Sequence, residues 1–287
     1  MPITNIHAVA PSVVGINESF SLSLRLLAEP REAPWYAQWD HPFPSVAGPF
    51  NLSARDIHYL ENTAPPWDGI LKLRGDDGYE GPAEVSFAPE DKSVGADQRP
   101  IRRILGLRFR SPGVKFLRVS DPAGGLEAVS NPIRVEPQPP AERLFWGDLH
   151  VHTIFTDGLR CPEELYAFAR DEAFLDICAL SDHSEGITDA QWEYFTDVTN
   201  RHNQSGRFVT LVGGEWTSMQ YGHHNYYYRG DRGPIFRSLD PRLQHLDQFH
   251  EAAVAALDRH VVFGKVLFAF GYVRQVRWHG DARGVNR

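Results

Sequence analysis

The residues best suited to chemistry lie in the stretch W-G-D-L-H-V-H-T-I-F-T-D-G, from Trp146 to Gly158. Successive side chains of a β-strand point to opposite faces, so His150 and His152 would share a face and could bind one metal ion. The His-x-His motif is weak evidence on its own, because roughly 0.6 chance matches are expected in a chain with 13 histidines. Taken alone, it leaves open both a metal site and an ordinary polar cluster.

Two later stretches also carry polar residues at the ends of predicted strands. Asp182 and His183 close F-L-D-I-C-A-L-S-D-H, and Glu215 lies at the end of R-F-V-T-L-V-G-G-E-W. Imidazole and carboxylate ligands together suit Zn²⁺, Mn²⁺ or Fe²⁺. A carboxylate can also bridge two ions, as hydrolytic two-metal sites require. The shared position at strand ends therefore predicts a site for divalent metal ions.

The elements that carry these motifs alternate between strand and helix. Pro162 stands at a suitable first helical position, and helices are also predicted over residues 189–204 and 244–260. Such alternation predicts an α/β fold, either a parallel sheet or a βα barrel. In βα barrels the active site lies at the carboxyl ends of the strands, where the polar motifs are expected here.

The part of the chain before residue 140 has a different pattern. Apolar residues alternate with polar ones over residues 19–27, and proline and glycine recur throughout, which predicts a small all-β sandwich. A proline-rich segment, residues 136–143, reads as a linker. We therefore expect a β-sandwich-like domain over 1–140 and an α/β domain over 141–287. The aromatic run over residues 34–44 could line a ligand groove or lie buried at the domain interface, and the interface is favoured.

Composition excludes several classes of protein. Lys and Arg total 29 and Asp and Glu total 37, which gives a net charge of −8 and disfavours binding to nucleic acid or to an anionic membrane. No apolar run is long enough to cross a membrane, and the first residues do not resemble a signal peptide. The two cysteines, Cys161 and Cys178, do not form a disulfide framework. These features predict a cytoplasmic protein.

The motifs in order, G-D-L-H-V-H-T-I-F-T-D-G, L-S-D-H, G-G-E-W-T-S and G-H-H-N-Y-Y-Y, resemble those of the PHP (polymerase and histidinol phosphatase) superfamily. The resemblance covers about residues 143–229. Ser130-Asn131-Pro132 and the linker are similar to a bacterial branch in which a β domain precedes W-G-D-L-H. The resemblance implies a distorted βα barrel that binds one to three metal ions and hydrolyses phosphate esters.

The resemblance also implies a role for individual residues. His150 and His152 would bind a first metal, and Glu215 would bridge it to a second. His223 would bind the second metal, with His224 as the alternative. Asp157 and His183 would belong to a third. Catalysis would depend on three of these residues: Glu215, His183 and Asp157.

The end of the chain departs from the superfamily pattern. The stretch after about residue 263 lacks the later histidine and the Asp-x-His that a complete site requires. The barrel that the resemblance implies has seven strands. From residue 143 onward there is room for only about four or five βα units of ~30 residues. We therefore expect a barrel that is truncated or divergent, with weakened activity, and an open edge that favours self-association.

The sequence thus predicts a metal-dependent hydrolase, best described as a phosphoesterase with a small phosphorylated substrate. The alternative is a binding or sensing module with a degenerate metal site. In that case the β domain would recognise a partner and the second domain would turn over little or nothing. Metal content together with activity on a generic phosphodiester separates the two.

Overall fold

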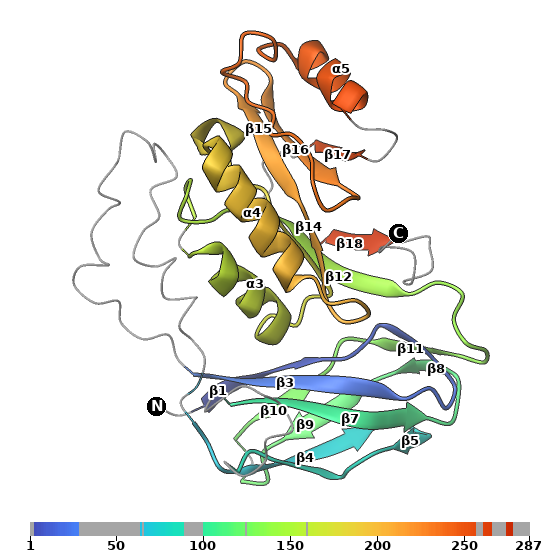
Figure 1. Cartoon of the computed structure of the whole chain (residues 1–287). Helices are drawn as coiled ribbons and strands as arrows, with labels where there is room; N and C mark the ends of the chain where they lie inside the picture. The colour runs from blue at the N-terminus through green and yellow to red at the C-terminus, as the bar shows by residue number, and fades with distance from the viewer. Residues whose placement is uncertain are drawn as a thin grey trace. The chain divides into compact units, whose positions relative to one another are not determined.

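A computed structural model describes most of the chain (Figure 1), namely residues 3–28, 64, 66–88, 100–123, 125–158, 160–256, 261–265 and 274–277. The chain divides into two compact units, Met1–Leu144 and Phe145–Arg287. The aromatic run over residues 34–44 lies outside the described residues, as does most of the sequence after residue 265. None of the helices in the described ranges is long and apolar enough to span a membrane.

The described residues of the first unit form β-strands. These are β1 (Ile3–Val9), β2 (Val13–Gly15), β3 (Phe20–Ala28), β4 (Ile70–Gly75), β5 (Tyr79–Glu80), β6 (Glu84–Ser86), β7 (Ile101–Phe109), β8 (Gly113–Lys115), β9 (Leu117–Ser120), β10 (Glu127–Val129) and β11 (Ile133–Glu136). They pair in the orders β1-β3-β7-β5, β10-β9-β4-β6 and β2-β11-β8. Most pairs are antiparallel, and β11 pairs in parallel with β2.

One hydrophobic core joins the sheets of the first unit. The alternation that predicted β3 is present, because Leu22, Leu24 and Leu26 have no exposed surface. They belong to the same buried cluster as Leu73 of β4 and Val119 of β9. Burying one such side chain contributes roughly 1.5–3 kcal/mol. The first unit therefore has a core of its own.

The second unit contains three α-helices among its described residues, α3 (Pro162–Asp171), α4 (Asp189–His202) and α5 (Leu246–Ala256), and one 3₁₀ helix, η4 (Ser184–Gly186). Its strands are β12 (Leu144–Val151), β13 (Ile177–Leu180), β14 (Val209–Leu211), β15 (Gly213–Ser218), β16 (Gly222–Tyr228), β17 (Val261–Lys265) and β18 (Arg274–Arg277). They form two sheets, β14-β13-β12-β18 and β15-β16-β17. The strands β12, β13 and β14 are parallel to one another.

The strand β15 continues the path of β14 past the end of β13. Ile177 pairs with Val209, and the same register places Glu215 beside His183 in an isolated parallel bridge. The Glu215 N–H donates to the carbonyl of Asp182 at 3.0 Å. Glu215 therefore lies where the parallel sheet ends and the second sheet begins.

The expected α/β barrel is wrong for the described residues, in which strand residues outnumber helical residues and no βα barrel is present. The difference begins at β16, which pairs antiparallel with β15 and then with β17. Only Met219, Gln220 and Tyr221 connect β15 to β16. A parallel crossover needs a dozen or more residues, whereas a short turn can join only antiparallel neighbours. The polar strand ends of the sequence thus belong partly to a hairpin.

Candidate metal centre

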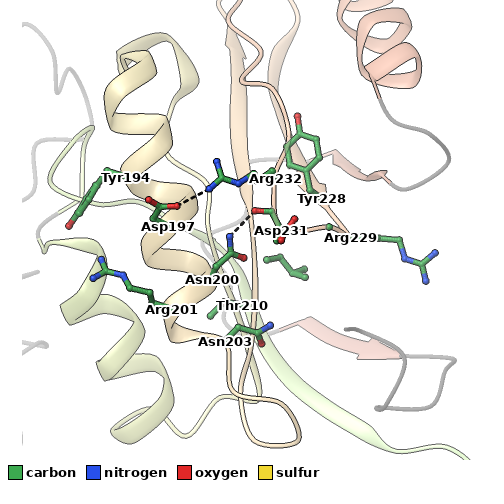
Figure 2. A pocket seen from close by; sticks show the side chains of 12 residues that line it. Tyr194, Asp197, Asn200, Arg201, Asn203, Thr210, Tyr228, Arg229, Asp231 and Arg232 are labelled. Carbon is green, nitrogen blue, oxygen red and sulfur yellow. Dashed lines mark hydrogen bonds and ion pairs between the residues drawn. The ribbon is translucent and has the colours of Figure 1, made fainter. Parts of the chain in front are cut away.

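An open polar pocket lies beside α4 and the end of β16 (Figure 2). Its lining consists of Tyr194, Asp197, Asn200, Arg201, Asn203, Thr210, Leu211, Tyr228, Arg229, Gly230, Asp231 and Arg232. Within it Arg232 pairs with Asp197 at 3.3 Å, and Asn200 donates to the carbonyl of Asp231 at 2.7 Å. None of the site residues predicted from the sequence lines this pocket, so their chemistry belongs elsewhere.

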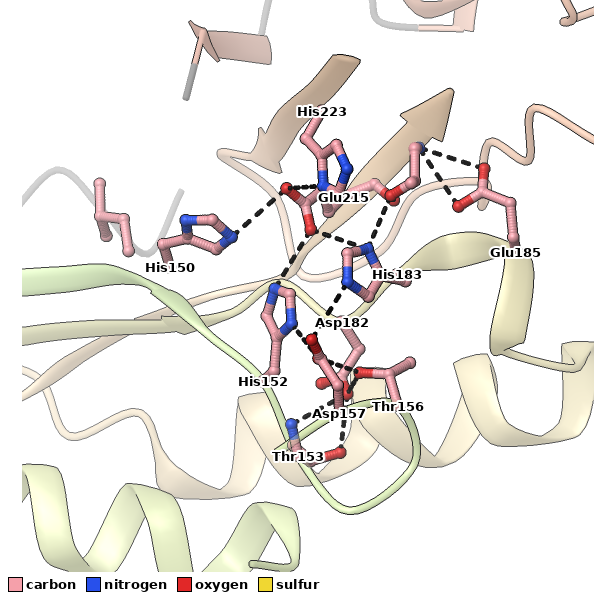
Figure 3. A network of polar contacts seen from close by, with 12 residues as sticks. His150, His152, Thr153, Thr156, Asp157, Asp182, His183, Glu185, Glu215 and His223 are labelled. Atoms are coloured by element: carbon pink, nitrogen blue, oxygen red, sulfur yellow. Dashed lines mark hydrogen bonds and ion pairs between the residues drawn. The ribbon is translucent and has the colours of Figure 1, made fainter. Parts of the chain in front are cut away.

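The carboxylate of Glu215 is the centre of a histidine cluster (Figure 3). Its side chain has no exposed surface. His150 Nε2 and His223 Nδ1 lie 3.4 and 3.1 Å from Oε1. His152 Nε2 and His183 Nδ1 lie 3.2 and 2.9 Å from Oε2. One buried carboxylate therefore faces four imidazole rings.

These five residues come from four parts of the second unit. His150 lies in β12 and His152 directly after it, while His183 follows β13. Glu215 lies in β15. His223 lies in β16, where it pairs with Thr217, two residues after Glu215. Strand ends of one sheet and a hairpin of the other thus supply the cluster together.

Asp157 provides a second carboxylate at the edge of the cluster. Its Oδ1 lies 2.5 Å from His152 Nδ1, and its Oδ2 lies 3.5 Å from His183 Nε2. The loop that carries it is closed by the Gly158 N–H, which donates to the carbonyl of Thr153 at 2.9 Å. A Cβ atom at Gly158 would lie 2.0 Å from the carbonyl oxygen of His152, so only glycine fits there without a shift.

The six predicted ligands form three overlapping groups that could hold a metal ion. The groups are His150–His152–Glu215, His152–Asp157–His183 and His183–Glu215–His223. Within each group the possible ligand atoms lie within 4.8 Å of one another. The structure therefore brings together all six residues, although their roles stay a prediction.

The charges of the cluster are strongly coupled. Burial disfavours the charged form of Glu215, but hydrogen bonds from His150, His152 and His183 outweigh it and hold its pKa far below the usual range. Burial likewise disfavours protonation of His152, yet hydrogen bonds with Asp157 and Glu215 raise its pKa to about 9. The same balance raises the pKa of His183 to about 10. Without metal, both imidazoles are cationic at neutral pH.

Two buried atoms of the cluster indicate that a cation fits. His152 Nε2 and Glu215 Oε2 lie 3.2 Å apart as an ion pair, but neither atom has a hydrogen bond of good geometry among the described residues. Buried polar atoms are normally hydrogen-bonded, and an exception needs an explanation such as a bound ion. A divalent cation would accept electron pairs from both atoms. The donor set and the convergence of these atoms therefore suit a metal ion.

Two acidic residues near the cluster hold the backbone instead. Asp182 Oδ1 accepts from the Thr153 N–H, the Thr153 hydroxyl and the Thr156 hydroxyl at 2.9, 3.0 and 2.6 Å. Asp148 Oδ1 accepts from the His150 N–H at 3.0 Å. Burial raises the pKa of both carboxyl groups. These contacts fix the loop after β12 and the start of the His-x-His motif.

Two supporting residues were not singled out from the sequence. The Thr217 hydroxyl lies 2.7 Å from His183 Nδ1, and the Glu185 carboxylate accepts from the Thr217 N–H at 3.2 Å. Glu185 also accepts from the N–H of Ser238 at 2.7 Å. The alternation along G-G-E-W-T-S places Thr217 on the same face as Glu215, and this was the available signal.

The adjacent histidines of β16 lie on opposite faces of the hairpin. His223 points to Glu215. His224 Nε2 contacts the Tyr221 carbonyl at 3.1 Å, and its ring packs against Trp216 with centroids 5.8 Å apart. Of the two residues that the sequence left open, the geometry thus places His223 in the cluster.

Comparisons with known proteins give limited information. Residues 156–234 match a family described as "Protein of unknown function (DUF3604)". This stretch contains Asp157, His183, Glu215 and His223 and excludes the His-x-His motif. No curated protein matches the chain.

Among solved structures, one match is the "D0-D1 domain of Intimin". It is 7% identical, with a TM-score of 0.26, and the match covers 47% of this chain and 47% of that chain. The chain therefore spans about half the length of that structure. A likeness at this level supports no statement about fold or activity.

The expected membership of the PHP superfamily is wrong by these findings. The matching family is DUF3604, and the described residues form mostly β structure with three α-helices. Short His, Asp and Glu motifs at strand ends specify ligand chemistry, which unrelated folds can share. They do not specify how the strands that carry them connect.

Proposed function

We propose that this protein is a metal-dependent hydrolase of phosphate esters, with a small phosphorylated molecule as its substrate. The observation that carries the proposal is the fully buried Glu215 carboxylate, which four histidine nitrogens approach within 2.9–3.4 Å. Imidazole and carboxylate ligands together favour Zn²⁺, Mn²⁺ or Fe²⁺. A cytoplasmic location belongs to the same proposal and is supported by the two free thiols, Cys161 and Cys178.

The sharing of ligands favours two ions over three. One imidazole nitrogen binds one ion. The group His152–Asp157–His183 uses two histidines that the other two groups, His150–His152–Glu215 and His183–Glu215–His223, also need. These other two groups share Glu215 alone. Two ions bridged by Glu215 would therefore use His150 and His152 on one side and His183 and His223 on the other. Asp157 would then orient His152 and His183.

A divalent ion lowers the pKa of bound water to about 7, and a pair of ions stabilises both the attacking and the leaving oxygen of a phosphoryl group. The protein residues hold this chemistry in place. Asp157 would accept a hydrogen bond from His152 Nδ1, so that Nε2 of the same ring faces Glu215. Asp157 Oδ2 lies 3.5 Å from His183 Nε2, so that Nδ1 of this ring faces Glu215. These contacts orient the ligands before any ion binds.

The test measures metal content and turnover together. Metals in the natively purified protein are quantified by elemental analysis. Hydrolysis of p-nitrophenyl phosphate and bis-p-nitrophenyl phosphate is then followed with added Mn²⁺ or Zn²⁺. We expect bound metal and metal-dependent turnover, both lost in His150→Ala/His152→Ala. Bound metal without turnover would favour the binding or sensing module, and negligible metal in the wild type would refute both.

A further inference from the structure

Asn225 lies on the face of the β15–β16 hairpin that carries the metal cluster. It pairs directly with Glu215 in the antiparallel register of the two strands. Directly opposed residues of an antiparallel pair have their Cβ atoms about 4.5–5.5 Å apart on the same face. His223, two residues earlier on β16, lies on this face as well and contacts Glu215. Asn225 therefore stands immediately beside the proposed ligands.

The amide of Asn225 is buried, since the residue is 1% exposed. Neither its side-chain oxygen nor its side-chain nitrogen makes a hydrogen bond of good geometry within the described residues. An amide offers two donors and one acceptor, and its contact with Tyr227, which lowers the pKa of that tyrosine, leaves most of this capacity unused. A buried polar group in this state indicates an absent partner, such as a bound water, ion or ligand.

Tyr227, two residues after Asn225, lies on the same face of β16. Tyr227 donates its hydroxyl proton to the carbonyl of Leu149 in β12, next to His150. Burial raises the pKa of Tyr227, the Asn225 amide lowers it, and the nearby charges of Glu215 and Asp148 raise it further. The Asn225 side chain thus lies between Tyr227 and His223, on the side of the hairpin that faces β12.

We propose that Asn225 is a positioning residue of the metal centre, whose amide hydrogen-bonds an oxygen ligand of an ion held by His150, His152 and Glu215. That oxygen belongs to water in the resting protein or to a phosphoryl group of the substrate. The inference rests on the proposed function. It gives the buried Asn225 amide a hydrogen-bond partner, namely an oxygen atom bound to the metal ion. Hydrogen bonds from outside the ligand shell commonly orient what a metal binds.

The experiment compares Zn²⁺ affinity with the stability of the metal-free protein, using the full chain. Asn225→Leu removes the amide and keeps a similar volume. We expect Zn²⁺ to bind about 10–100-fold more weakly, as for other outer-shell partners. We also expect an unchanged or higher melting temperature without metal, because a buried unpaired amide has been removed. A purely structural asparagine would not move these two measurements in opposite directions.

Thr199→Val is the matched control. Thr199 is buried in the same unit, and its hydroxyl bonds to that of Tyr166 at 2.9 Å, away from the cluster. This variant should lower the melting temperature and leave the Zn²⁺ affinity unchanged. Calorimetric titration with Zn²⁺ and thermal unfolding followed by circular dichroism give both readouts for each protein.

Asn225→Asp keeps the inference testable if the leucine variant does not fold. A carboxylate facing the ion should strengthen Zn²⁺ binding by at least about threefold, since added ligand charge raises metal affinity. Zn²⁺ affinity within twofold of the wild type in the variants that fold would overturn the role of Asn225 while leaving the proposed metal site intact. A wild type that binds no Zn²⁺ or Mn²⁺ would overturn both.

Discussion

At the scale of single residues, Glu215 determines what the site can do. A carboxylate without exposed surface is expensive to keep ionised unless partners compensate the lost hydration. Here the compensation comes from four imidazole rings, which lie within 3.4 Å. The same geometry that stabilises the charge in the metal-free protein brings together the residues of two potential metal-binding groups that share Glu215.

Glu215→Gln should abolish tight metal binding, because the amide carries no charge and cannot bridge two ions as a carboxylate does. We expect at least about a 100-fold loss of Zn²⁺ affinity, measured as metal retained per chain after dialysis. Glu193→Gln is the control, since Glu193 is an exposed carboxylate on α4 that lies 3.8 Å from Arg232. Equal retention by the two variants would contradict the assignment of Glu215.

The protonation of His152 and His183 makes metal binding depend on pH. Their pKa values of about 9 and about 10 lie above the ordinary 6.5, so both are cationic at neutral pH without metal. A metal ion must displace these protons. Metal affinity should therefore rise with pH up to about pH 10 and then level off. Titration calorimetry in buffers of different ionisation enthalpy should detect proton release at pH 7.5.

The metal-free protein should show the opposite trend in stability. A raised pKa contributes stability that is fully present below the unfolded value and is lost as pH rises through the folded value. Its melting temperature should therefore fall between about pH 6.5 and pH 10. In Asp157→Asn, where one partner of His152 is neutral, this fall should be smaller and should end at lower pH. A melting temperature that does not change over this interval would show that the imidazoles are neutral.

At the scale of elements, the sequence predicted the clustered residues better than it predicted how the strands that carry them are connected. The spacing of His150 and His152 and the position of Glu215 at a strand end follow from the period of two in a strand, and the structure brings these residues together. The pairing of β15 with β16 depends on how tightly the Met219–Tyr221 turn closes, a tertiary outcome that periodicity does not encode. Asn225 was missed for this reason, because its place opposite Glu215 exists only in the hairpin.

The loop after β12 should be sensitive to one methyl group. In Gly158→Ala the new Cβ would meet the His152 carbonyl oxygen at 2.0 Å, so the loop must move and carry Asp157 away from His152. We expect a destabilisation of about 1–3 kcal/mol and weaker metal binding. Gly186→Ala is the control, since its nearest contact is the Thr156 methyl at 3.4 Å. Chemical denaturation gives the free energy of unfolding for both.

At the scale of the whole molecule, the two units have separate cores. The buried cluster of the first unit contains residues of that unit only. A fragment spanning residues 1–144 should therefore fold alone and give a strand-rich far-UV circular dichroism spectrum with a cooperative thermal transition. A helix-rich or unfolded spectrum would contradict this expectation.

The fold class was the weakest inference from the sequence. Strand–helix alternation is present from β12 to β14, where the parallel sheet forms as expected. Beyond β14 the sequence also predicted a further strand and then a helix over residues 244–260, which indicated that the alternation continues. Polar residues at strand ends mark where ligands lie and do not distinguish a crossover from a hairpin. Composition and period are local properties, whereas closure of a barrel depends on every strand at once.

The position of Glu215, where the parallel sheet passes into the hairpin, has a consequence for the lifetime of the protein in a cell. An ion held by His150 and His152 on one sheet and by Glu215 on the other would cross-link the two sheets. Anything that binds only the folded state shifts the unfolding equilibrium, by about 2.7 kcal/mol at 100 times its dissociation constant. In chains made when the metal is scarce, the two sheets would separate more often, and these chains would be degraded sooner. The abundance of the protein would then follow the metal supply without any dedicated regulator.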